Sequence, residues 1–214
     1  SSRGPTQPVL PTPDKTTGSA AAPQLEVAFE DITSAQGLSS IYHNGEEAQE
    51  RSIMESIGGG VAVLDYDRDG WDDLFFPGGG QLENKSVTGL AGALWRNRDS
   101  HALTNVSSAA RVDVVAGYKH GAVSADWNND GFSDLLVSGY SGLQLFTNQG
   151  DGTFMEHSLQ AGLDDTQWST STAFADLDND GDLDLYVAHY VNWSWDNHPS
   201  CESQGIPDIC APGA

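Results

Sequence analysis

The hydrophobic residues of this 214-residue chain are grouped in short runs, and clusters of polar residues separate the runs. Residues 61–64 and 74–76 are two such runs, and they flank an acidic segment. Apolar runs of this length between turn residues are typical of β-strands and too short for most helices. The 24 glycines of the chain fit the many tight turns that short strands require. We therefore expect an all-β fold.

The same pattern occurs three times. The sequences GVAVLDYDRDGWDDLFFPGG, GAVSADWNNDGFSDLLVSGY and STAFADLDNDGDLDLYVAHY begin at Gly60, Gly121 and Ser171. A second element, FEDIT, LTNVS or FMEHS, recurs out of phase with the first. Repeats about 50 to 60 residues apart are typical of arrays of supersecondary units, and propeller blades have repeats of this size.

One repeat can be divided into four antiparallel strands. Residues 61–64 and 74–76 are the first two, ALWRN is the third and LTNVS the fourth. In the next repeat, NQGDGTF joins the last two strands through Asp151 and Gly152, a favourable hairpin turn. Four short antiparallel strands make a β-propeller blade. The expected fold is thus a β-propeller of four-stranded blades.

The propeller is expected to be incomplete in this chain, with about three blades. Blades are predicted near residues 58–110, 118–163 and 168–214, within a domain over 25–214. Three blades are too few to close a ring, so the rest of the propeller or a partner protein should complete it. A strand over 27–33, containing FEDIT, is expected to close a missing last blade. Residues 1–24, rich in Pro, Thr and Ser, are predicted to be a linker or tether.

Three acidic loops carry the candidate chemistry. Oxygen-bearing groups recur at loop positions 1, 3, 5 and 9, position 6 is always glycine, and position 7 would contribute its backbone carbonyl. Positions 1, 3, 5, 7 and 9 are Asp65, Asp67, Asp69, Trp71 and Asp73; Asp126, Asn128, Asp130, Phe132 and Asp134; and Asp176, Asp178, Asp180, Asp182 and Asp184. Hard oxygen ligands at alternate positions with a glycine at the sharp turn suit Ca²⁺, whereas Mg²⁺ would use fewer protein ligands. We expect three Ca²⁺ sites.

Two other interpretations of these loops are disfavoured. An EF-hand needs a glutamate at position 12 and flanking helices. Position 12 is Phe76, Val137 or Val187, and the flanking residues are β-rich. A solvated acidic turn is a reasonable interpretation of one copy, but not of three copies in register between apolar runs.

The net charge of the chain limits the classes of partner that it can bind. The formal net charge is -22, which argues against nucleic acid and anionic membranes and fits a binder of polyvalent cations. No run of about 18 apolar residues is present, so no membrane span is expected. The chain starts Ser-Ser-Arg-Gly, so no signal peptide is expected in it, and a mature secreted chain would look the same. Cys201 and Cys210 are spaced for one local disulfide, although two free thiols fit the spacing as well.

The acidic loops resemble the FG-GAP/VCBS calcium repeats of the integrin α-subunit propeller. The fuller pattern of FEDIT, DYDRDGWDDL and NQGDGTF is similar to that of the ASPIC/UnbV and cartilage acidic protein group, from residue 27 to about residue 210. The segment CESQGIPDIC is similar to a cysteine-bounded insertion of that group, and Gly205 and Pro207 within it favour a turn, so we predict a disulfide. Asn128 departs from the pattern and leaves its site one charge short. The resemblance implies further blades and a C-terminal domain.

The resemblance and the residues together favour a non-enzymatic role. The leading hypothesis is a secreted, periplasmic or cell-surface scaffold that binds protein or glycan in adhesion, with structural Ca²⁺. The alternative is part of a calcium-dependent carbohydrate-active enzyme, similar to propeller-containing polysaccharide lyases. Tryptophans 95, 168, 193 and 195 could form a sugar platform or pack between blades, and histidines 43, 120 and 189 could serve a site or the core.

Overall fold

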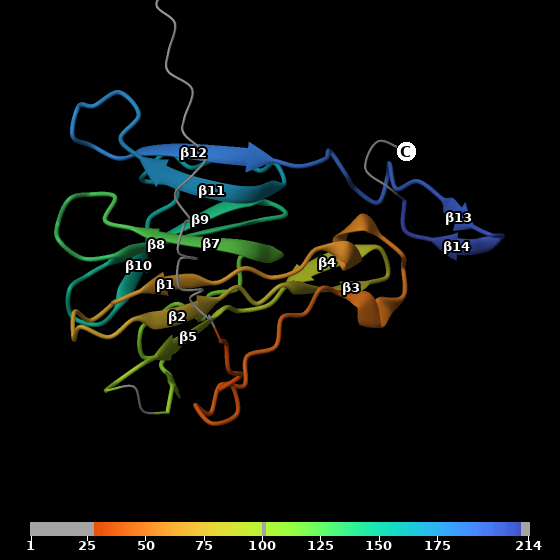
Figure 1. The fold of residues 1–214 in the computed structure, drawn as a ribbon. Helices are drawn as coiled ribbons and strands as arrows, with labels where there is room; N and C mark the ends of the chain where they lie inside the picture. Colours follow the sequence, from red (N-terminus) through yellow and green to blue (C-terminus); the bar gives the residue numbers. More distant parts are fainter. Residues whose placement is uncertain (1–27, 100–101, 211–214) are drawn as a thin grey trace, which may run out of the picture. The chain divides into compact units, whose positions relative to one another are not determined.

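The computed structural model of the protein describes residues 28–99 and 102–210 (Figure 1). The chain divides into a short unit that ends at Asp31 and a large unit that begins at Ile32. In the described residues of the large unit, two short 3-10 helices, η1 (Glu46–Ala48) and η2 (Ile53–Ser56), accompany fourteen strands. The expected all-β class is confirmed. The predicted tether over 1–24 lies outside the described residues.

The strands form two complete four-stranded antiparallel sheets and three hairpins. The strands are β1 (Ala62–Leu64), β2 (Asp73–Phe76), β3 (Gly80–Glu83), β4 (Ser86–Gly89), β5 (Ala93–Arg96), β6 (Thr104–Asn105), β7 (Lys119–Ala125), β8 (Asp134–Gly139), β9 (Gly142–Asn148), β10 (Phe154–Glu156), β11 (Ser169–Ala175), β12 (Asp184–His189), β13 (Cys201–Ser203) and β14 (Ile206–Asp208). We call β1-β2-β5-β6 the first blade, β7-β8-β9-β10 the second blade and the β11-β12 pair the third blade. The described part of the chain contains no apolar helix of membrane-spanning length.

The second blade lies between the other two (Figure 1). Its central strand β8 is buried along its whole length. Leu135 and Val137 pack against residues of the first blade, and we call this cluster the first interblade core. Leu136 lies on the opposite face of β8 and packs against residues of the third blade, in a cluster that we call the second interblade core. Because strand side chains alternate between the two faces, an apolar run such as LLV fits a strand that is covered on both sides.

Two larger sets of residues make up these cores. The first interblade core consists of Ala62, Leu64, Tyr66, Phe75, Leu94, Ala110, Val112, Leu135, Val137, Phe146 and Phe154. The second consists of Leu136, Leu143 and Leu145, with Val123, Trp127, Ala161, Leu163, Phe174, Leu185 and Val187 packed against them.

The outer faces of the first and third blades remain exposed. Val63 of β1 is 51% exposed and Tyr186 of β12 is 66% exposed, although their strand neighbours face the two interblade cores. In the described residues the sheets do not close into a ring. This arrangement is that of an incomplete propeller, as the sequence predicted.

The structure differs from the expected boundaries in two places. Residues 28–32 form no strand, and residues 33–37 form a turn in which the backbone N–H of Gln36 donates to the carbonyl of Ile32 at 2.9 Å. A strand needs a partner, and no described strand pairs with this segment. Within the predicted third blade, only β11 and β12 belong to the blade among the described residues, because residues 190–210 form a loop and the separate β13-β14 hairpin.

Candidate metal centre in three acidic loops

Each acidic loop joins the first two strands of a blade. Its ninth residue is the first residue of the second strand and pairs with the residue just before the loop, as Asp73 does with Leu64. Asp134 and Asp184 hold the same register with Ala125 and Ala175. The predicted placement between strands is therefore confirmed.

The first aspartate of each loop organises the turn. The carboxylate of Asp65 accepts hydrogen bonds from the backbone N–H groups of Asp69, at 3.0 Å, and Gly70, at 2.9 Å. The same two bonds recur at Asp126 and Asp176. The glycine at position 6 has a φ of 88° in the first loop, 89° in the second and 96° in the third, a conformation that side chains disfavour.

The ninth aspartate is the most buried member of each of the first two loops. One oxygen of Asp73 accepts from the backbone N–H of Tyr66 at 3.1 Å, and the other accepts from that of Asn97 at 2.7 Å, just after the third strand. Asp134 repeats this arrangement with Trp127 and Asn148. Burial raises the pKa of Asp73 and of Asp134 to about 6. The backbone hydrogen bonds lower these pKa values, and the neighbouring carboxylates raise them.

The carboxylates converge closely enough to hold a cation. Oxygens of Asp65, Asp67 and Asp73 lie within 4.8 Å of one another, and so do oxygens of the three aspartates at positions 1, 3 and 5 of the third loop. Asp67 Oδ1 is buried without a hydrogen-bond partner. An orphaned carboxylate oxygen among other carboxylates fits a hard divalent cation.

In the second loop, the neutral side chain of Asn128 is hydrogen-bonded to Asp130. The amide Nδ2 of Asn128 donates to Asp130 Oδ2 at 2.9 Å, and Asn128 Oδ1 accepts from the backbone N–H of Asp130 at 3.1 Å. The described carboxylates of this loop do not form a group like those of the other two. Asn128 leaves this site one charge short, and its amide forms a hydrogen bond with Asp130 inside the loop.

Neighbouring loops contact each other through positions 4 and 7. The guanidinium of Arg68 lies 5.3 Å from the centre of the Phe132 ring, and Asn129 Nδ2 donates to Asp182 Oδ1 at 3.2 Å. Position 4 has a positive φ in all three loops, including Asn179 of the third. The residues expected at position 7 therefore also serve as contacts between blades.

One residue of the first loop site was not found from the sequence. Arg96, at the end of β5, forms ion pairs with Asp67 and Asp69, and its guanidinium donates to Asp69 Oδ2 at 3.1 Å. The two repeats differ in sequence at this position. The residue before the asparagine is Arg96 in ALWRN and Thr147 in LFTN. Without the strand register, that difference gave no reason to connect Arg96 with the acidic loop.

The two cysteines form the predicted disulfide. Cys201 and Cys210 are bonded, with their Cα atoms 5.3 Å apart, and the bond closes the β13-β14 hairpin. Gln204 and Gly205 form its two-residue turn with φ of 55° and 77°, as the twist of a tight hairpin favours.

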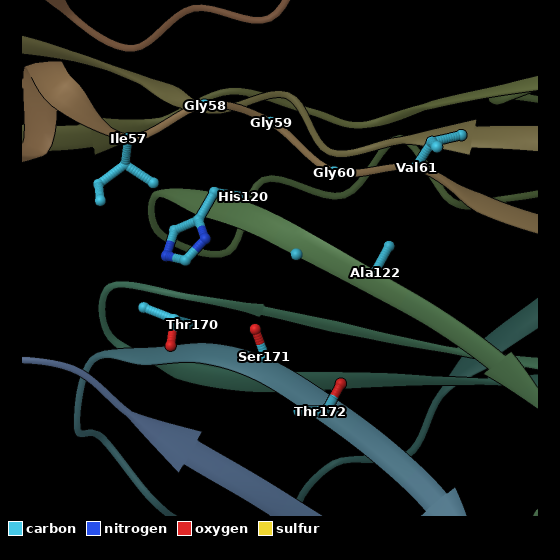
Figure 2. A pocket seen from close by; sticks show the side chains of 11 residues that line it. Ile57, Gly58, Gly59, Gly60, Val61, His120, Ala122, Thr170, Ser171 and Thr172 are labelled. Atoms are coloured by element: carbon cyan, nitrogen blue, oxygen red, sulfur yellow. The ribbon is translucent and has the colours of Figure 1, made fainter.

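A cavity of about 420 Å³ lies between the glycine run 58–60, β7 and β11 (Figure 2). His120 lines it and is 4% exposed. Trp168 Nε1 donates to His120 Nε2 at 2.8 Å, so the imidazole proton lies on Nδ1. Burial, with the nearby Lys119 charge, lowers the pKa of His120 to about 4, and the ring is neutral at neutral pH. The other polar side chains of the lining are the hydroxyls of Thr170, Ser171 and Thr172, which Figure 2 labels.

A serine, a histidine and an aspartate meet at the base of the third blade. His189 Nδ1 lies 3.2 Å from Ser169 Oγ, and His189 Nε2 lies 3.4 Å from Asp165 Oδ2. Ser169 is fully buried, which keeps its hydroxyl from a substrate. The contact therefore orders the start of β11 against the end of β12, and the third candidate histidine, His43, contacts Glu47 instead.

The tryptophans pack as an aromatic core. Trp168 is 4% and Trp193 is 6% exposed, and their rings meet edge to face with centroids 6.4 Å apart. Trp193 Nε1 donates to His198 Nδ1 at 3.2 Å. Trp95 is also buried, in the first blade. Trp168 and Trp193 also line a cavity of about 510 Å³, together with Tyr140 and Tyr190.

Comparison with known proteins finds one family model that matches part of the chain and two similar proteins. Residues 126–187, from the second loop through most of β12, match the model of the FG-GAP-like repeat. Cartilage acidic protein 1 of Homo sapiens is 34% identical over 95 residues, which is 44% of this chain and 14% of that protein. Cartilage acidic protein 1 of Xenopus tropicalis is 33% identical over 94 residues, 43% of this chain and 14% of that protein. The aligned part of the chain therefore spans about a seventh of these relatives.

Proposed function

This chain carries an FG-GAP-like repeat, and on that premise we propose that it is part of a calcium-binding propeller scaffold that acts outside the cytoplasm. The observation that carries the proposal is the threefold repetition of one loop geometry, with the same hydrogen bonds at positions 1, 5, 6 and 9. The loops would bind one Ca²⁺ each and hold the ends of the blades in a fixed shape for a protein or glycan partner.

Calcium is proposed to act structurally. The side chains at positions 1, 3, 5 and 9 and the carbonyl at position 7 come from one hairpin, so the protein can supply most of the six to eight oxygens that Ca²⁺ takes. Catalytic metals instead keep a position open for substrate. The bound ion would neutralise carboxylates that otherwise repel one another, including the buried Asp73 and Asp134.

A location outside the cytoplasm is supported by the disulfide. The bond between Cys201 and Cys210 closes a short hairpin in a chain that has no free cysteine among its described residues. Disulfides persist in oxidising compartments and are uncommon in the cytosol. We therefore propose that the protein is secreted, periplasmic or displayed at the cell surface.

The outer blades support the proposal that further blades or a partner protein complete the propeller. The second blade is covered on both faces, whereas Val63 and Tyr186 are exposed on the outer faces of the first and third. Position 4 of the first two loops contacts position 7 of the following loop. Asn179 holds position 4 of the third loop, and we propose that it contacts the matching loop of a following blade.

The enzymatic alternative receives less support from the cavity beside the glycine run 58–60. A lyase needs several acid and base groups that converge on one cleft. Among the described residues that line the cavity in Figure 2, His120 is the single titratable side chain, and it is neutral at neutral pH. We therefore favour the scaffold.

Thermal unfolding with and without chelator tests the proposal. Because Ca²⁺ would bind the folded loops and not the unfolded chain, EDTA should lower the melting temperature, and excess Ca²⁺ should restore it. An unchanged melting curve in EDTA, together with loss of a measurable enzymatic activity, would replace the structural role with the enzymatic alternative.

A further inference from the structure

The first acidic loop contains a cationic side chain inside its cluster of carboxylates. Arg96 comes from β5, two strands away from the strand that leads into the loop, and its guanidinium contacts both Asp67 and Asp69. These contacts are partly shielded from solvent, because the side chains of Arg96, Asp67 and Asp69 are 26%, 15% and 23% exposed. Ion pairs that are shielded in this way are stronger than those on the open surface.

The contacted aspartates are those expected at ligand positions 3 and 5. A guanidinium and a calcium ion cannot occupy the same space between two carboxylates. Asp67 is left with one buried oxygen that has no hydrogen bond, and Arg96 with a buried Nε that has none. The ion pair therefore leaves polar atoms of both side chains without partners. This favours replacement of the guanidinium by a cation that can bind both oxygens of Asp67.

The matching position in the second blade shows that this contact is specific to the first loop. Asn97 and Asn148 follow the third strands of the two blades and donate their backbone N–H groups to Asp73 and Asp134 in the same way. The preceding residue is Arg96 in the first blade and Thr147 in the second. Thr147 accepts a hydrogen bond from Trp127 Nε1 at 3.1 Å and brings no charge.

The three loops thus balance their charge differently. The first has four aspartates and Arg96, whereas the second has three aspartates and Asn128. In the third, where all four aspartates remain, the described structure has no ion pair to a carboxylate at position 1, 3, 5 or 9. When Arg96 is counted with the ligand-position side chains, the net charge is equal in the first two loops and more negative by one in the third.

We propose that Arg96 is an internal counter-cation of the first loop, which occupies the metal position when calcium is absent and must be displaced when calcium binds. The inference rests on the proposed calcium binding. It makes the first loop the least dependent on calcium for its shape and weaker in affinity than its four aspartates indicate. The third loop, which has no such substitute, becomes the site that holds calcium most tightly.

Arg96→Gln is the variant that tests the role, and Arg111→Gln is its matched control. Both remove one positive charge, but Arg111 is exposed and forms no described ion pair with an acidic loop. Calcium titration calorimetry at fixed ionic strength should show that Arg96→Gln tightens one site by about ten- to a hundredfold, the equivalent of one or two displaced charge-assisted hydrogen bonds. Arg111→Gln should leave all sites close to those of the wild-type protein.

Melting temperatures distinguish the proposed role of Arg96 from a purely structural one. In EDTA, Arg96→Gln should melt at a lower temperature than Arg111→Gln, and saturating calcium should remove that difference. A loss of stability that is equal with and without calcium, combined with unchanged or weaker calcium affinity, would overturn the proposal. Arg96→Lys keeps the charge without the planar fork and should give an intermediate calcium affinity.

A measurement on the wild-type protein keeps the test independent of how the variants fold. The side-chain Nε–H signal of Arg96 in NMR spectra should shift as calcium fills the first loop, because the guanidinium leaves the carboxylates. If calcium binds at all three loops and this signal stays unchanged, Arg96 is not displaced and the inference is wrong. If no loop binds calcium in any variant, the proposed function fails, and the inference fails with it.

Discussion

The replacement Leu136→Ala tests the arrangement of the blades. Leu136 is fully buried at the centre of β8, where it pairs with Val123 on one side and Leu145 on the other. All three side chains belong to the second interblade core, so the cavity left by alanine would lie between the second and third blades.

The expected loss of unfolding free energy is large. Replacing a buried leucine by alanine costs about 2–5 kcal/mol, and the fixed strands on both sides favour the middle of that range, about 3 kcal/mol. For a domain of this size each kcal/mol lowers the melting temperature by about 2–4 °C, so the shift should be about 6–12 °C.

The assay is urea unfolding of the 214-residue chain in saturating calcium, followed by tryptophan fluorescence. Tyr186→Thr is the control, because Tyr186 is 66% exposed on the opposite face of the third blade and threonine keeps the β propensity. Its cost should stay within about 0.5 kcal/mol. If Leu136→Ala costs no more than Tyr186→Thr, the third blade does not pack on the second as described.

Three other predictions follow from individual contacts. Since the pKa of His120 is lowered to about 4 by burial, the contribution of this residue to stability should be complete above pH 6.5 and fall as the pH drops towards 4, by up to about 3 kcal/mol; His120→Gln, which keeps an acceptor for Trp168, should remove this part of the pH dependence in urea titrations. Reduction of the Cys201–Cys210 bond should destabilise the β13-β14 hairpin by about 2.5 kcal/mol, visible as faster amide hydrogen exchange there; equal exchange before and after reduction would contradict this. Asp180→Ala should abolish calcium binding at the third loop alone, and among the unmodified loops the second, with Asn128, should release its ion before the third; calorimetry that still finds three sites in Asp180→Ala would refute the ligand assignment.

The sequence was informative where neighbouring residues determine the structure. The strands that flank each acidic loop, the glycine at its sixth position and the hairpin around Gly205 follow from local apolar and turn patterns. The spacing of the aspartates likewise placed them together at the hairpin ends. Three copies of the same pattern made the blade recognisable without any knowledge of the packing.

The rest depends on contacts between residues far apart in the chain. Arg96 reaches the first loop because β5 pairs with β2, a register that the sequence alone does not specify. The segment over 27–33 has the composition of a strand, but its described residues, 28–33, are not in a strand. The aromatic residues after β12 have no periodicity of their own, and their core exists because the segment around Met54 and the β3-β4 hairpin pack against them.

Anomalous X-ray scattering from crystals grown in millimolar calcium would show whether the three acidic loops hold three calcium ions. We expect one anomalous peak in each loop, with oxygen ligands from positions 1, 3, 5, 7 and 9 at about 2.3–2.6 Å. Loops without peaks at saturating calcium would contradict this expectation.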